Sequence, residues 1–132
     1  MRIAQAVVDE IAAHSIAEVP NECCGLVGGR DGDMTTVYRA RNAEQSPLRY
    51  SVHPADQFKI METIEEAGEE LLGIYHSHTK SEAWPSQTDI NLAEAWPDPL
   101  YLICSLADPD AAVVRAFAIR DGAVDEISFE RT

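Results

Sequence analysis

The segment LLGIYHSH, residues 71–78, restricts the possible folds of this chain more than any other. Side chains alternate between two faces along a strand, and here both faces are apolar until His76. A strand that is apolar on both faces is typical of the buried interior of a sheet. We therefore predict a central strand that ends in His-Ser-His, where two imidazoles and a hydroxyl come together.

Three other segments have the periodicity of helices. An amphipathic helix is expected from Ile3 to about Ala17, and the others cover residues 55–70 and 86–96. In the second helix, the side chains expected to face the core are those of Phe58, Ile60, Met61, Ile64 and Ala67.

The remaining patterned segments are rich in β-branched and other apolar residues, as strands are. They are residues 22–29, 34–42, 100–106, 111–119 and 123–130, with a hairpin turn at 120–122. No linker, repeat or low-complexity stretch divides the chain. The predicted fold is α+β: a single domain over residues 1–132, with a mixed, strongly curved β-sheet and about three helices.

Composition narrows the range of partners. The chain has 23 acidic and 10 basic residues, a formal net charge of −13, which repels phosphate backbones and anionic lipid. We therefore expect no nucleic-acid partner and no membrane association, and no stretch is apolar enough to span a bilayer. The three cysteines include the adjacent pair Cys23 and Cys24, which suits neither a disulfide framework nor C-x-x-C zinc ligation. Reduced, partly buried thiols in a cytoplasmic protein are the simpler interpretation.

His76 and His78 share one face of the predicted strand, continuing the face of Leu72 and Ile74. One histidine at a strand end is usually structural, but two on one face make a metal site an equal alternative. Asp89 heads an apolar stripe on the helix that begins near Ser86. Taken alone, Ser86-x-x-Asp89 is better explained as a capping box, although capping does not account for the paired histidines.

Two imidazoles and a carboxylate leave the fourth position of a zinc ion open, which is the catalytic rather than the structural pattern. Such a site needs a proton acceptor, and Glu22 is the candidate. Glu22 is the first residue of a predicted strand and shares a face with Cys24 and Leu26, so its side chain is expected to point to the core side at the end of that strand. Considered by itself, Glu22 is better explained as a solvated residue in a loop.

Together these residues resemble the signature of the JAMM (MPN+) metalloproteases, E…H-S/T-H-x7-S-x2-D, with every position and spacing matched. The order of elements is also similar to that family over nearly the whole chain, which implies an MPN-domain fold related to cytidine deaminases. A deaminase-type zinc site would require the motifs H-x-E and P-C-x-x-C, and the chain contains neither. The metalloprotease motif H-E-x-x-H is absent as well. The threonine after HSH, the segment SEAWPSQTD and the segment NAEQSPLRY are similar to the bacterial Mec-like branch.

The resemblance implies roles for five residues. His76, His78 and Asp89 would bind one Zn²⁺ per chain, Glu22 would transfer protons, and Ser86 would stabilise the oxyanion. The implied reaction is hydrolysis of an amide bond.

The resemblance also implies the substrate, a small ubiquitin-like sulfur-carrier protein with a Gly-Gly tail. The enzyme would remove a residue such as cysteine from the end of that tail. Two alternatives remain open: a lysine isopeptidase acting on ubiquitin-like conjugates, and a non-catalytic scaffold of the same fold. A homodimer is compatible with either.

Overall fold

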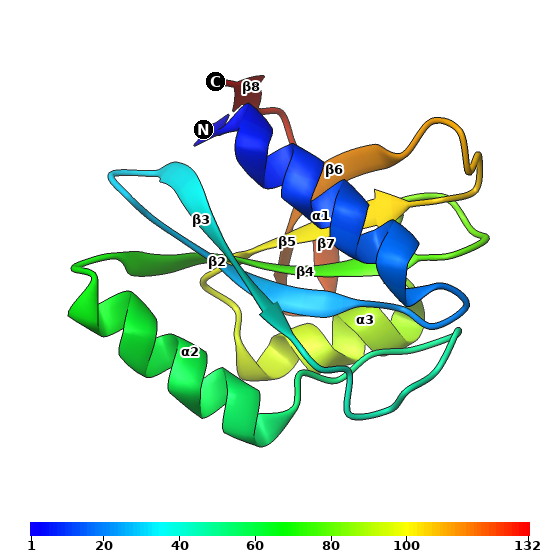
Figure 1. Ribbon diagram of the computed structural model, residues 1–132, viewed down its shortest axis with the longest axis horizontal. Coiled ribbons are helices and arrows are strands. Elements are labelled where there is room, and N and C mark those ends of the chain that lie inside the picture. Colours follow the sequence, from blue (N-terminus) through cyan, green and yellow to red (C-terminus); the bar gives the residue numbers. More distant parts are fainter.

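The computed structural model describes residues 1–132 and contains one mixed sheet of eight strands, twisted and curled, with helices packed on it (Figure 1). In chain order the elements are β1 (Arg2–Ile3), α1 (Gln5–Glu18), β2 (Cys24–Arg30), β3 (Asp33–Ala40), α2 (Pro54–Glu66), β4 (Glu70–His78), α3 (Gln87–Leu92), the 3₁₀ helix η1 (Ala93–Ala95), β5 (Leu100–Ser105), β6 (Val113–Arg120), β7 (Ala123–Ile127) and β8 (Glu130–Arg131).

The strand order across the sheet is β7-β6-β5-β4-β2-β3-β1-β8. The predicted central strand is confirmed: β4 pairs with β2 on one edge, antiparallel, and with β5 on the other, parallel. The short strands β1 and β8 pair with each other, which brings the two ends of the chain together in Figure 1. The hairpin between β6 and β7 turns at Asp121 and Gly122, both with positive φ, as such tight turns require.

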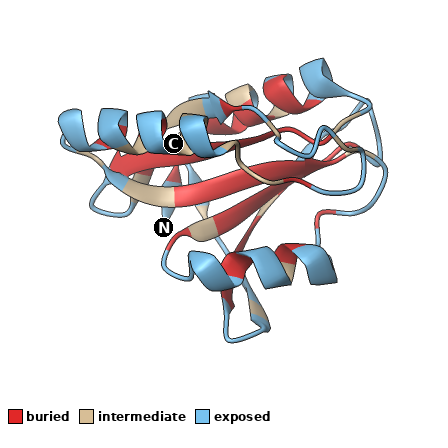
Figure 2. Cartoon of the chain, turned by 90° about the horizontal axis from the view of Figure 1, so that it is seen from below, coloured by how far each residue is buried: buried red, intermediate tan, exposed pale blue.

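Each face of the sheet carries its own apolar cluster. The α1-side core joins Val7 and Ile11 to Tyr75 and Leu102, and the α2-side core joins Ile64 to residues of β2, β4, β5 and β6. The sheet is the buried layer between helices on either side (Figure 2). Because Ala93 beyond the end of α3 packs in the α2-side core, α3 lies on the same side as α2.

Local sequence explains where the helices begin and end. Pro54 occupies the first turn of α2, and the His53 side chain accepts a hydrogen bond from the Ala55 N–H. Gly68, with φ of +70°, follows the last turn and allows the chain to reverse into β4. The helix therefore stops at Glu66 and not at residue 70 as predicted.

Expectations about the placement of four residues were wrong. Ile3 belongs to β1, because it pairs with Met34 before the helix begins. Phe58 is 70% exposed, and Ala67 is also exposed because the helix has already ended. Leu72 faces the α1-side core, away from Ile74, because the β2–β4 pairing shifts between Val27–Gly73 and Gly28–Leu71.

The three cysteines are free and buried, in agreement with the expectation of reduced thiols. None of the helices combines the length and the apolar character that crossing a membrane would require.

Gly25 keeps β2 close to β4, because a methyl group there would lie 2.4 Å from Tyr75 Cε1 and 2.5 Å from the Tyr38 carbonyl oxygen. We expect Gly25→Ala to lower the free energy of unfolding by about 2 kcal/mol or more, measured by urea denaturation. Gly73→Ala is the matched control, since the nearest atoms to its methyl would be the flexible end of Met34, at 3.0 Å, with Val27 Cβ at an ordinary contact distance of 3.4 Å. Equal losses in the two variants would contradict this account of the β2–β4 contact.

Candidate metal centre

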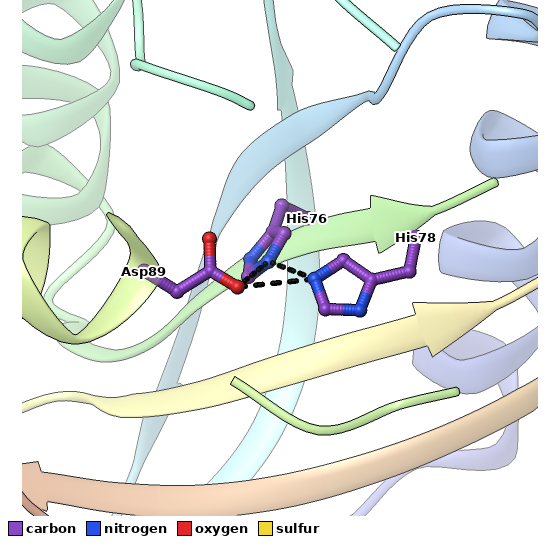
Figure 3. A group of neighbouring side chains, drawn as sticks. All are labelled: His76, His78 and Asp89. Carbon is purple, nitrogen blue, oxygen red and sulfur yellow. Dashed lines mark hydrogen bonds and ion pairs between the residues drawn. The ribbon is translucent and has the colours of Figure 1, made fainter. Parts of the chain in front are cut away.

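His76 and His78 end β4 with both imidazoles on the α2 side of the sheet, as their spacing predicted. Their Nε2 atoms lie 3.2 Å apart, and both side chains are buried (Figure 3). At this distance the two nitrogen atoms need either a shared proton or a cation between them, because two lone pairs facing each other repel. The pair is therefore more than a polar rim at the end of the strand.

Asp89, in the first turn of α3, completes a group of three. Its Oδ2 atom lies 3.1 Å from His76 Nε2 and 3.0 Å from His78 Nε2, and the carboxylate is buried (Figure 3). All three candidate ligand atoms lie within 4.8 Å of one another. The structure thus brings together, from β4 and α3, the three residues that the sequence singled out as metal ligands.

The imidazole of His78 is oriented by the chain itself. Its Nδ1 atom lies 2.8 Å from the Glu82 carbonyl oxygen, which can only accept, so Nδ1 donates. In the neutral ring Nε2 then carries a lone pair, and that lone pair faces the Asp89 carboxylate. This arrangement requires either a proton on Nε2 or a cation between the two groups.

The charges in the group are strongly coupled. Burial opposes ionisation of Asp89, but hydrogen bonds from His76 and His78 outweigh it and hold the pKa of this carboxyl well below its ordinary value. Burial lowers the pKa of His76. For His78, burial acts in the same direction, but the contacts with Asp89 and the Glu82 carbonyl prevail and raise its pKa.

A metal ion suits this donor set. Ligand atoms held at about 2.0–2.1 Å from one tetrahedral centre lie roughly 3.3 Å from each other. The three measured separations, 3.0, 3.1 and 3.2 Å, are close to that value. Two imidazoles and one carboxylate can therefore hold a divalent cation with little movement.

Ser86 and Asp89 also form the capping box that the sequence allowed as the competing explanation. The Ser86 hydroxyl oxygen accepts a hydrogen bond from the Asp89 N–H (3.1 Å), and Asp89 Oδ2 accepts one from the Ser86 N–H (3.0 Å). Capping and metal ligation are thus not mutually exclusive, because the carboxylate oxygen that caps the helix also faces the two imidazoles. The Ser86 O–H has no acceptor within the protein and can still donate.

Glu22 lies just before β2 and is 4% exposed, so it is not a solvated loop residue. Its backbone N–H donates to the Ser46 carbonyl, whereas its side-chain Oε1 atom is buried without a hydrogen-bond partner. Burial raises the pKa of this carboxyl to about 7. A carboxyl that titrates near neutral pH and has no structural partner can accept and return a proton.

A cleft of about 780 Å³ connects these groups, since Glu22, His78 and Ser86 all line it. Three of the residues that line it are exposed apolar side chains, Val19, Leu48 and Trp84. Leu48 is the most exposed of the three, at 81%.

Sequence reasoning missed two close neighbours of the site. Tyr50, in the polar segment between β3 and α2, stacks on the His76 ring with 4.1 Å between ring centroids and 15° between ring planes. An aromatic residue inside a polar loop was the only available signal. The Glu82 carbonyl was also missed, because a backbone oxygen leaves no trace in the sequence.

Comparison with known proteins is consistent with this geometry. A family model described as Prok-JAB, prokaryotic homologs of the JAB domain, matches residues 4–120. The chain belongs to this family. The resemblance to JAMM proteins that the sequence suggested is thereby confirmed.

Several relatives in the Prok-JAB family carry names that state an activity. The CysO-cysteine peptidase of Mycobacterium tuberculosis is 39% identical over 121 residues, covering 90% of this chain and 82% of that protein. The desampylase of Haloferax volcanii is 39% identical over 105 residues, covering 74% of each chain. A probable TtuB-protein conjugate cleaving protease of Thermus thermophilus is 36% identical over 121 residues, covering 91% of this chain and 76% of that protein.

Solved structures share the fold. A protein of Desulfitobacterium hafniense has a TM-score of 0.90 and 36% identity, covering 99% of this chain and 92% of its own. A structure described as a JAMM metalloprotease-like zinc site in the proteasome and signalosome has a TM-score of 0.65 and 16% identity, covering 100% and 97%. The predicted MPN-type fold is thus confirmed.

The unpartnered carboxyl of Glu22 predicts a pH-dependent stability difference in metal-free protein. Because the pKa of Glu22 is raised to about 7 from an ordinary value of 4.5, its stabilising contribution is complete below pH 4.5 and is lost as pH rises through 7. Glu22→Gln cannot ionise, so it should not lose this contribution as pH rises. The free energy of unfolding of the variant minus that of the parent should therefore increase by about 2 kcal/mol between pH 5 and pH 8.

Urea denaturation in the presence of a chelator measures this difference. The control is Glu66→Gln, which removes the same formal charge from an exposed position at the end of α2. A constant difference between Glu22→Gln and the parent across this pH range would refute the buried environment assigned to Glu22.

Proposed function

We propose that this protein is a zinc-dependent peptidase that hydrolyses the amide bond after the C-terminal Gly-Gly of a small ubiquitin-like sulfur carrier. The observation that carries the proposal is the position of Glu22. A buried carboxyl without a structural partner lines the same cleft as His78 and Ser86, next to a group of three metal-ligand side chains. A scaffold protein has no need for a proton acceptor at that place.

Zinc is the proposed metal because the donors are two imidazole nitrogens and a carboxylate oxygen, a set typical of catalytic zinc sites with three protein ligands. His76, His78 and Asp89 would hold it. When bound, the ion supplies Lewis acidity, which makes water nucleophilic near neutral pH and polarises a carbonyl.

The chain's own residues supply the proton transfers. The Glu22 carboxylate takes a proton from the attacking water as the oxygen of that water bonds to the carbonyl carbon. The C–N bond then breaks, and Glu22 returns the proton to the leaving amine, so that one water is consumed per amide cleaved. The Ser86 O–H, which no protein acceptor uses, donates to the carbonyl oxygen as negative charge develops on it.

Relatives' names support the substrate class, since they read CysO-cysteine peptidase, desampylase and probable TtuB-protein conjugate cleaving protease. The relative with the broadest coverage of its own length is the CysO-cysteine peptidase, so we place release of a single residue, such as cysteine, first. The second candidate is cleavage of a lysine isopeptide in a protein conjugate, which the name of the Thermus thermophilus relative favours. The exposed Leu48 and Trp84 offer a contact surface for a carrier protein in either case.

The metal assignment predicts the zinc content of histidine variants. We expect about one zinc per chain in the parent protein and little in His76→Ala or His78→Ala, because each removes one of three protein ligands. Elemental analysis of purified protein measures the content. His53→Ala is the control, since His53 caps α2 and is not part of the group of three. Full zinc content in both site variants would rule out these ligands.

The decisive test of the function uses Glu22→Gln and a carrier protein ending in Gly-Gly-Cys. The amide is nearly isosteric with the carboxyl but cannot accept the proton, so cleavage should fall by about a hundred- to ten-thousandfold. Zinc content and affinity for the carrier should be retained. All three quantities are measured on one preparation, with mass spectrometry following the release of cysteine.

A matched isopeptide substrate, the same carrier joined to a lysine side chain, separates the two candidate functions in the parent protein. Faster cleavage of the isopeptide would place the second candidate first. A parent protein that binds zinc and carrier but cleaves neither substrate would disprove the proposed activity and favour the scaffold alternative.

A further inference from the structure

The two histidines of the metal centre are held in different ways. His78 is oriented by a hydrogen bond from Nδ1 to the Glu82 carbonyl. His76 has no such bond, because its Nδ1 atom is buried and has no partner. Histidines that bind metals almost always use the second ring nitrogen in a hydrogen bond that fixes the ring plane. Something else must therefore hold the His76 ring.

Tyr50 covers the face of that ring. The two rings are stacked, with centroids 4.1 Å apart and planes 15° from parallel, and Tyr50 is 4% exposed. Stacking restricts rotation of the imidazole out of its plane, and this rotation is what the missing hydrogen bond would otherwise prevent. The contact thus aims Nε2 at Asp89 and His78.

Tyr50 is itself fixed by one side chain. The Asn42 amide nitrogen donates to the Arg49 carbonyl, and its oxygen accepts from the Ser51 N–H, so its bonds bracket Tyr50 on both sides. The same amide nitrogen also donates to the Glu22 carbonyl. One amide therefore ties the segment that carries Tyr50 to the residue proposed as the proton acceptor.

We propose that Tyr50 is a positioning residue for the metal centre, which fixes the His76 imidazole by ring stacking in place of a hydrogen bond. This assignment rests on the metal site of the proposed function. The competing explanation is that Tyr50 only fills the α2-side core, in which it is buried together with Tyr101. The two explanations predict different effects on zinc affinity when the aromatic ring of Tyr50 is replaced by an aliphatic side chain.

The test measures zinc affinity by competition with a chromophoric chelator, which needs no substrate. Tyr50→Phe keeps the stacked ring and should bind zinc within about twofold of the parent. Tyr50→Leu keeps an apolar side chain but no ring face, and its affinity should fall about ten- to a hundredfold, as when other groups that orient metal ligands are lost. Tyr50→Met, with a flexible side chain that fills the same space, is the second variant should Tyr50→Leu not fold.

Tyr101→Leu is the matched control, because Tyr101 is equally buried in the same core and makes no stacking contact with a histidine. Its zinc affinity should stay within about twofold of the parent. Parent-like affinity in Tyr50→Leu or Tyr50→Met, or an equal loss in Tyr101→Leu, would overturn the positioning role and leave the proposed function intact. A parent protein that binds no zinc would instead overturn both.

Discussion

The Asp89 carboxylate is the contact on which the rest of the site depends. A buried carboxylate is costly unless it is paired, and Oδ2 of Asp89 faces two imidazoles while accepting the Ser86 N–H. The same residue therefore starts α3 and closes the group of three ligand side chains. Because these tasks share one oxygen atom, the beginning of the helix cannot move without moving a candidate metal ligand.

Pairing within the sheet supplies the other half of the geometry. Cys24 on β2 lies opposite His76 on β4, so the residue two positions before Cys24 emerges beside the histidines. Glu22 reaches the site through this register and not through any contact of its own side chain. Gly25 matters for the same reason, since the close approach of β2 to Tyr75 maintains the pairing.

Much of this arrangement could be predicted from the sequence. The two-residue spacing of His76 and His78 fixes their common face, because strand periodicity is local. The sequence predicted that Glu22 opens a strand, but β2 begins only at Cys24. Glu22 nevertheless lines the same cleft as His78, as strand parity suggested, because β2 and β4 pair regularly from Cys24 to Val27. At the other end the same rule failed for Leu72, since a shift in register depends on both strands together. The prediction that Phe58 faces the core was wrong for a related reason. Helical spacing predicts which side chains share one face of a helix, but not how much of that face the sheet covers.

The roles of Tyr50 and the Glu82 carbonyl could not be predicted, because both depend on the path by which a long connecting loop returns to the sheet. Their contacts also explain where the protein leaves polar groups unsatisfied. The two buried side-chain atoms without partners, Glu22 Oε1 and His76 Nδ1, both belong to this one site. Folded proteins rarely leave such groups unpaired, and exceptions gather where function requires them. At Glu22 the missing partner leaves the carboxyl free to move a proton, and at His76 a stacked ring takes over the orienting role that a hydrogen bond usually has.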